Sequence, residues 1–292
     1  MPYGFIRSIE QKGYSDETIK SYERVVSQFF VFIKQLYPDS KEPHEINPLD
    51  IKQYLDGQID NDKSISTVNK ELAIIKTMFH YFWENNIVPI DPTVKIKRYA
   101  VKEKPVVEIS YKVISSLVDK VLSNSDYSKL RKALFILAAK GLKTADFRFK
   151  KKDVIDHTFK DQVDIKLKNR KITLLDKEAS YFLEYYYETL FNDSEYVFTT
   201  KPHGSDIGGP IEVMSILNHL RYISQDFLSD KKPLNLLVIR RAIAYDLYMK
   251  KLPIQQIAKE LGIEEMTTSN FVKMLTSGAN QKDLEEKNEL SV

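Results

Sequence analysis

Hydrophobic residues recur at spacings of three and four along most of this chain, which is the period of a helix that buries one face. The first such stretch, between residues 15 and 37, contains Ile19, Tyr22, Val26, Phe29, Phe30, Ile33 and Tyr37. The same period predicts further helices over 48–58, 66–86, 110–122, 130–140, 179–191, 211–228, 233–249, 253–261 and 267–275. The pattern predicts a mainly α-helical protein, and a hydrophobic content of 42% in 292 residues suffices for a sizeable core.

One segment departs from the helical period. Apolar residues alternate with polar ones in 163–167 and in 172–174, on either side of a basic turn at 168–171. Alternation with period two is typical of β-strands, so 163–174 is predicted to form a β-hairpin. A further short strand is predicted at 196–199. We therefore expect a mainly α fold with a small β-hairpin or sheet.

Prolines and basic residues concentrate after the third predicted helix and indicate a linker over 89–105. We expect an α-helical domain at 1–102, which includes most of this basic linker, and an α+β domain at 103–275. The segment 276–292 contains four acidic residues and two lysines and is expected to be a flexible acidic tail.

Composition narrows the kinds of site that the chain can carry. It has no cysteine, and its five histidines are scattered, so disulfides and thiolate metal sites are excluded and no metal-ligand spacing is present. We expect no metal and no cofactor. No run of about 18 apolar residues is present, and the first 25 residues lack an apolar signal core. These features predict a cytoplasmic protein that has no membrane partner.

Basic residues gather in three segments, although the formal net charge is only +3. The segments are 93–104, 143–152 and 166–171. Clusters of this kind indicate a polyanionic partner. The alternative is a solvated charged surface with no partner.

Motifs in both predicted domains resemble, in the same order, those of the tyrosine recombinases, the phage integrase family. In the first domain they are GYSDETIKSY at 13–22 and ISTVNKEL at 65–72. In the second domain they are AKGLKTADF at 139–147, the hairpin at 163–174, VIRRAIAYDL at 238–247 and LGIEEMTTS at 261–269. The resemblance implies a two-domain tyrosine-recombinase fold, in which a helical core-binding domain and an α+β catalytic-like domain clamp double-stranded DNA.

The resemblance also implies where catalytic residues would lie. In that family a tyrosine attacks a DNA phosphodiester, and two arginines, usually a lysine, and histidine or tryptophan side chains assist. The corresponding positions are Lys143 for the first arginine, Leu237 for a histidine, Arg240 for the second arginine, Ile263 for histidine or tryptophan, and Val272 for the nucleophile. Only Arg240 matches, and residues 249–292 contain no tyrosine. We expect no catalytic residues and no DNA cleavage.

The same resemblance implies that basic residues still bind DNA phosphates. The expected DNA-binding residues are Lys70, Lys76, Lys95, Lys97, Arg98, Lys143, Arg148, Lys150, Lys151, Lys166, Lys168, Arg170, Arg240 and Arg241. Structural alternatives stay open, because Arg240 can instead pair with Asp246 or a helix terminus, and Lys143 and the hairpin lysines can be solvated. A tyrosine cluster at 181–187 is typical of helix packing rather than of base stacking.

Residues 253–274 also have the spacing of a helix-turn-helix, with 267–274 as the reading helix. The polar Thr268 stands where that motif usually has an apolar residue. The recombinase resemblance accounts for this stretch and for the rest of the chain together.

A recombinase-like layout that has lost its catalytic residues is similar to the recombinase-fold master repressors of SPβ-type Bacillus prophages. It implies a transcriptional repressor that binds operator-like sites in the nucleoid of a bacterial host and maintains lysogeny. It also implies self-association through the C-terminal segment and release by a protein or peptide antirepressor. The alternative is an accessory DNA-binding protein in site-specific recombination or integration. An enzyme with another nucleophile and a protein-interaction module are the remaining alternatives.

Overall fold

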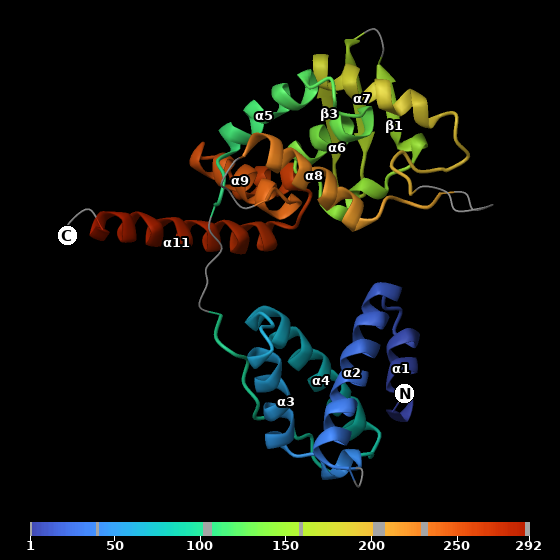
Figure 1. Ribbon diagram of the computed structural model, residues 1–292, viewed down its shortest axis with the longest axis vertical. Helices are drawn as coiled ribbons and strands as arrows, with labels where there is room; N and C mark the ends of the chain where they lie inside the picture. Colours follow the sequence, from blue (N-terminus) through green and yellow to red (C-terminus); the bar gives the residue numbers. More distant parts are fainter. Residues whose placement is uncertain are drawn as a thin grey trace. The chain divides into compact units, whose positions relative to one another are not determined.

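The computed structural model describes residues 2–38, 41–101, 107–157, 160–200, 208–228 and 233–289. The chain divides into two compact units, Met1–Glu103 and Lys104–Val292. Figure 1 shows the backbone of both units, and each unit has its own core of buried hydrophobic residues.

The N-terminal unit is entirely helical. Its helices are α1 (Phe5–Gln11), α2 (Asp16–Leu36), α3 (Pro48–Asp60) and α4 (Ile65–Glu84). Side chains cap the last three at their start, because Ser15 and Ser64 each accept a backbone N–H and Asn47 accepts two. Edge-to-face contacts of Phe29 with Tyr54 and Phe79 fill the centre of the unit. Helix α1 and its short approach were not predicted from the sequence.

The segment that follows α4 is fastened to the unit by Tyr99. The Asn69 amide donates to the Tyr99 carbonyl at 2.9 Å and accepts its N–H at 2.9 Å, and the Tyr99 hydroxyl donates to Asp56 at 2.5 Å. These contacts hold the basic residues beside Tyr99 against α4.

The described part of the C-terminal unit contains seven helices, among them the largely buried α6, and a small antiparallel sheet. Its helices are α5 (Tyr111–Ser123), α6 (Lys129–Ala139), α7 (Asp176–Thr189), α8 (Val213–Phe227), α9 (Leu236–Met249), α10 (Ile254–Leu261) and α11 (Glu265–Glu289). The strands β1 (Val154–His157), β2 (Gln162–Lys166) and β3 (Lys171–Leu175) pair in sequence order. Asp164 lies opposite Thr173, and Ile165 lies opposite Ile172. In Figure 1 helix α11 extends beyond the body of this unit.

Several local predictions are wrong. The sheet has a third strand, β1, in addition to the predicted hairpin. The predicted strand at 196–199 forms only isolated bridges, from Tyr196 to Lys150 and from Thr199 to Pro210. The last helix does not end at Leu275 but continues to Glu289.

Candidate functional site

Arg240 joins the ends of two helices. Its side chain is only 8% exposed on α9, and it donates from Nη1 to the Gly141 carbonyl at 2.5 Å and from Nη2 to the Leu261 carbonyl at 3.1 Å. Gly141 follows α6, and Leu261 ends α10. Carbonyls at helix C-termini have no partner within the helix and carry the negative end of its dipole, so a guanidinium satisfies them well. The Asp246 carboxylate pairs with Lys250 at 2.7 Å.

Helix α10 ends in a Schellman turn that leaves two carbonyls for arginines. The N–H of Gly262, at φ 62°, donates to Lys259, and the N–H of Ile263 donates to Ala258. The carbonyls of Glu260 and Leu261 are left over. Arg170, from the hairpin turn, donates to Glu260, and Arg240 donates to Leu261. We call Arg170 and Arg240 the guanidinium pair.

A mixed charge environment surrounds this pair. Burial lowers the pKa of Arg170 and of Arg240, the Asp146 carboxylate opposes that change in both, and the charge of Arg240 lowers the pKa of Arg170 further. Asp146 also accepts the backbone N–H of Lys143 at 3.1 Å. The backbone of Lys143 and the guanidiniums of Arg170 and Arg240 thus all interact with Asp146.

The hydrogen-bonding capacity of the pair is not exhausted. Among the described residues, Nε and Nη2 of Arg170 are buried and have no hydrogen-bond partner. Buried donors on a charged group are costly unless an acceptor meets them. A phosphate oxygen is an acceptor that suits the planar fork of arginine. No group of three metal-ligating side chains occurs among the described residues.

The other positions that sequence analysis aligned with family catalytic residues hold apolar side chains. Leu237 is 50% exposed at the start of α9, and Ile263 packs partly buried against the core. Val272, which the resemblance aligned with the nucleophile, is 5% exposed on α11. Thr268 is fully buried, and its hydroxyl donates to the Glu264 carbonyl at 3.0 Å.

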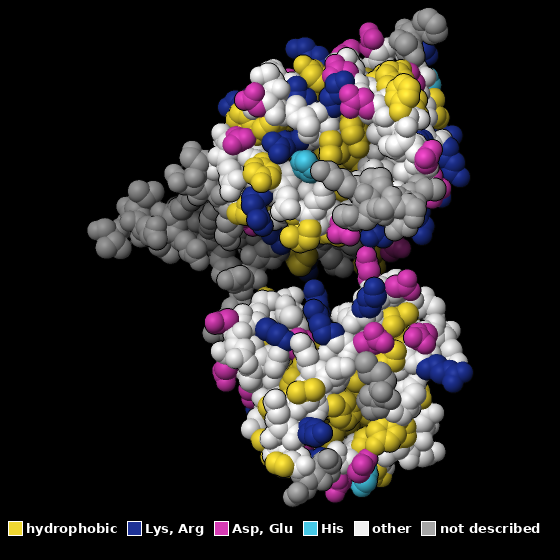
Figure 2. All heavy atoms as spheres, turned by 45° about the vertical axis from the view of Figure 1, so that its right-hand side comes forward, with side chains coloured by type: hydrophobic (Ala, Val, Ile, Leu, Met, Phe, Trp, Pro, Cys, Tyr) yellow, Lys and Arg dark blue, Asp and Glu magenta, His cyan; other side chains and the backbone are white. Residues whose placement is uncertain are grey.

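Besides Arg170 and Arg240, the predicted basic residues Arg241, Lys150 and Lys151 interact within the protein. Arg241 lies 3.6 Å from Glu108, Lys150 lies 2.8 Å from Glu195, and Lys151 donates to the Asn192 carbonyl at 2.7 Å. The side chains of Arg148, Lys166 and Lys168 are exposed. Figure 2 shows basic and acidic side chains interspersed over its visible face of the unit.

In the N-terminal unit the structure brings two predicted residues together. Lys70 and Arg98 line one hollow of about 380 Å³, because Asn69 holds the Tyr99 backbone beside α4. Its other lining residues are Ser66, Asn69, Ala73, Tyr99 and Val101. Lys95 and Lys97 are exposed on the same segment, whereas Lys76 is half-buried and does not line the hollow.

The tyrosines of α7 are used in packing. Tyr185 donates to the Val197 carbonyl at 3.1 Å, Tyr186 donates to the Lys151 carbonyl at 3.2 Å, and Tyr187 donates to Asp156. The Tyr181 ring lies under Lys132. These contacts agree with the helix-packing interpretation.

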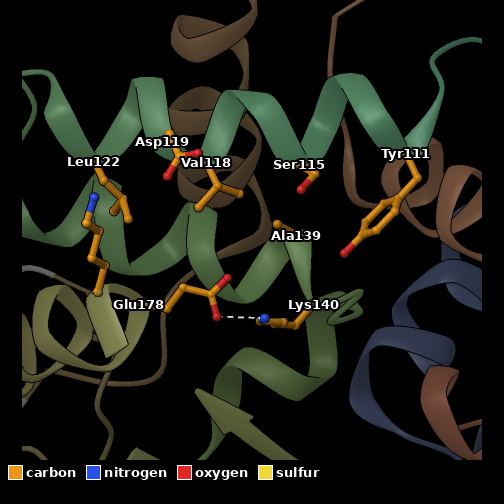
Figure 3. Close-up of a pocket in the computed structure, with 9 residues that line it drawn as sticks. Tyr111, Ser115, Val118, Asp119, Leu122, Ala139, Lys140 and Glu178 are labelled. Carbon is orange, nitrogen blue, oxygen red and sulfur yellow. Dashed lines mark ion pairs between the residues drawn. The ribbon is translucent and has the colours of Figure 1, made fainter. Parts of the chain in front are cut away.

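A second hollow, of about 140 Å³, lies between α5, the end of α6 and the start of α7 (Figure 3). Tyr111, Ser115 and Asp119 line it from α5, and Lys140 and Glu178 form an ion pair at 2.6 Å below that helix. None of the predicted DNA-binding residues lines it.

Sequence analysis missed Asp146, Glu260 and Gly262 as parts of the site. The signal for the last two was the Leu-Gly pair at the end of a predicted helix, which is typical of a Schellman turn. Their pairing with arginines from distant segments has no local signature.

Sequence comparisons point to recombinases. Residues 3–87 match the family described as "Phage integrase, N-terminal SAM-like domain". Tyrosine recombinase XerC of Thermodesulfovibrio yellowstonii is 32% identical over 30% of this chain and 29% of its own length. Tyrosine recombinase XerD of Listeria monocytogenes is 28% identical over 62% of this chain and 61% of its own length. The chain therefore spans less than two thirds of these curated relatives.

Solved structures share the fold across nearly the whole chain. A lambda integrase dimer bound to a COC' core site superposes with a TM-score of 0.67 at 14% identity, covering 92% of each chain. The Tn1549 transposon integrase in complex with transposon right end DNA gives a TM-score of 0.70 at 13% identity, covering 97% of each chain. The fold is that of the tyrosine recombinases, as predicted, and the three comparisons together support that family.

Proposed function

We propose that this chain, which has the fold of the tyrosine recombinases, binds double-stranded DNA at specific sites without cleaving it. Support for DNA as the partner comes from basic residues in both units, Lys70 and Arg98 in the first and the guanidinium pair in the second. Phosphate contacts of this kind supply affinity and register, and base contacts supply specificity. The two structural relatives described above were solved as DNA complexes.

The resemblance aligns Arg240 with the second arginine of the family and Val272 with its nucleophile. Arg240 keeps its guanidinium, whereas Val272 is a buried side chain without a hydroxyl, and this contrast supports the proposal. Removing even one group that stabilises a transition state typically costs about 10²–10³ in rate. A chain without the attacking hydroxyl, and with lysine for the first arginine, retains binding groups for a phosphate and lacks the chemistry to break its ester bond.

Binding without cleavage suits a repressor, because an occupied operator must stay intact. We propose a prophage transcriptional repressor that maintains lysogeny on the bacterial nucleoid, self-associates through its C-terminal segment and is released by a protein or peptide antirepressor. The curated relatives are recombinases, and this favours a second candidate, an accessory protein in site-specific recombination.

Selection of fragments of the source genome by purified protein, at near-physiological salt and followed by sequencing, tests both candidates. Many short related sites near promoters would support the repressor. A single inverted pair at an attachment junction would support the accessory role. No enrichment at any salt concentration would overturn DNA binding. Covalent protein–DNA adducts on nicked versions of the selected sites would overturn the absence of cleavage.

A further inference from the structure

A groove lies between α5 and the end of β3. The hollow of about 140 Å³ at α5 and a further hollow, of about 470 Å³ at the end of β3, share Lys140, Lys177 and Glu178 as lining residues. We call them the α5 hollow and the β3 hollow. Thr173, Leu175 and Asp176 complete the lining of the β3 hollow. None of the predicted DNA-binding residues lines either hollow, so the proposed DNA contacts leave the groove unused.

Helix α5 turns a row of polar side chains into the α5 hollow. Tyr111, Ser115 and Asp119 are spaced four residues apart, which places them on one face of the helix. They lie on the side of α5 that faces the ion pair of Lys140 and Glu178 (Figure 3). Within the described part of the chain, none of the three side chains makes a hydrogen bond or an ion pair. The hollow therefore has acceptors to offer to a ligand.

The lining of the α5 hollow suits a long side chain with a cationic end. Val118, Leu122 and Ala139 supply apolar surface for methylene groups. The Asp119 carboxylate and the hydroxyls of Tyr111 and Ser115 can accept from the five N–H donors of a guanidinium. The volume equals that of about four or five water molecules in the liquid, which is room for one side chain.

The charges of the groove favour the same ligand. Lys140 pairs with Glu178 at 2.6 Å, so these two charges offset each other. The carboxylates of Asp119 and Asp176 then outnumber the one remaining ammonium, that of Lys177. The β3 hollow continues beyond the ion pair, so the groove has space for the residues next to an inserted arginine.

We propose that the groove binds a peptide segment of a partner protein, that an arginine of this segment enters the α5 hollow, and that occupancy lowers the affinity of the chain for DNA. Arg240 donates to the Gly141 carbonyl at 2.5 Å, and Gly141 directly follows Lys140. An arginine that competes with Lys140 for Glu178 therefore acts one residue away from the acceptor of Arg240. This last step rests on the proposed function, and it gives the proposed antirepressor a place to bind.

A tripeptide tests the site without DNA. Acetyl-Ala-Arg-Ala-amide and its neutral citrulline analogue are titrated into the isotope-labelled full chain, and the backbone amide shifts are followed by NMR for the wild type, Asp119→Asn and Asp193→Asn. Asp193 is an exposed carboxylate that lines neither hollow, so its variant is the charge-matched control. The arginine peptide should shift the residues of the groove in the wild type and in Asp193→Asn. Asp119→Asn, and the citrulline analogue on the wild type, should each raise the Kd about fivefold.

Three results would overturn this assignment. One is an equal Kd for the wild type and Asp119→Asn, and another is a set of shifts confined to residues outside the groove. Sedimentation provides the third, because a wild type that is dimeric where Asp119→Asn is monomeric would mean that a second copy of this chain supplies the arginine.

A DNA arm uses a fragment recovered by the genomic selection. The arginine peptide at saturation should lower the DNA affinity of the wild type about fivefold and that of Asp119→Asn by less, which also controls for peptide that binds DNA directly. Equal affinity of the wild type with and without the peptide would overturn the coupling to DNA binding. A wild type that binds no fragment would instead overturn the proposed function, while the peptide titration would still decide whether the groove binds arginine.

Discussion

Arg240, the arginine of the second motif, connects parts of the fold and also carries a positive charge. Arg240 is buried and bridges the carbonyls of Gly141 and Leu261, which end two different helices. The sequence placed this residue in a phosphate site by resemblance and left a helix terminus open as its other partner. Side-chain burial depends on the whole core around α9, so no pattern near position 240 could decide how far the guanidinium is enclosed.

Arg240→Ala should therefore reduce stability as well as DNA affinity. Two buried carbonyls would lose their donor, at about 1–3 kcal/mol each, so the free energy of unfolding should fall by about 2–6 kcal/mol. Urea unfolding measures this change. Lys166→Ala, on the exposed end of β2, should change stability by less than about 0.5 kcal/mol. Equal stability of the two variants would show that the bridge contributes nothing.

Asp164 accepts hydrogen bonds from several side chains of the sheet. A hydrogen bond from the Thr173 hydroxyl lowers the pKa of Asp164, and burial opposes this change. Further hydrogen bonds with Lys171, His157 and Gln162 also lower the pKa, which reaches about 2, below its ordinary 3.8. Because the folded-state pKa is lowered, the carboxylate stabilises the fold fully above the unfolded pKa, and that contribution disappears as pH falls through about 2.

Asp164→Asn should thus be destabilising at pH 7, and its difference from the wild type should shrink between pH 4 and pH 2. Urea unfolding across this range measures it. Asp193→Asn, an exposed carboxylate of the same unit, should show no such trend. If the free energies of unfolding of the two proteins differed by the same amount at every pH, the charge of the Asp164 carboxylate would not be the source of the stabilisation.

At the level of elements, capped amphipathic helices were predicted closely and short or edge elements were not. Ser15 and Ser110 each accept the backbone N–H of the third residue beyond them, and the helices that they begin were predicted within one residue. Strand β1 has four half-buried residues and too little alternation to stand out. Helix α11 continues through polar residues, where no apolar period marks its course.

Gly141 follows α6 in a conformation that disfavours any other residue, and the cost of replacing it can be measured. Gly141 has φ 77°, and a Cβ there would lie 3.0 Å from Cδ1 of Ile243. Gly13 has φ 74°, but a Cβ there would meet no described atom within 4 Å. Gly13→Ala should cost about 1–2 kcal/mol from backbone conformation alone, and Gly141→Ala about 2–4 kcal/mol because crowding adds to it. Urea unfolding of the unit that carries each glycine measures the loss of stability in each variant. Equal losses for Gly13→Ala and Gly141→Ala would argue against crowding at the end of α6.

For the molecule as a whole, the sequence predicted the fold and a set of candidate basic residues. It did not predict which of these residues lie close together in the folded protein. Lys70 and Arg98 come together only because Asn69 binds the Tyr99 backbone. Arg170 reaches Arg240 only because the hairpin turn packs on α10. Both contacts join segments far apart in sequence, and a pattern read along the chain contains no information on such pairs.

If both units bind one DNA molecule, their phosphate contacts should add in the salt dependence of affinity. Each contact releases counterions and contributes about 0.9 to the slope of log K against log salt. Lys70→Gln and Lys143→Gln should each reduce the slope by about 0.9, and the double variant by about 1.8, because their contacts are separate. Lys250→Gln, whose ammonium pairs with Asp246 at 2.7 Å, should leave the slope unchanged. If the double variant had the same slope as Lys143→Gln alone, Lys70 of the N-terminal unit would make no phosphate contact. Of these two positions, only Lys143 in the C-terminal unit would then contribute to the electrostatic part of binding.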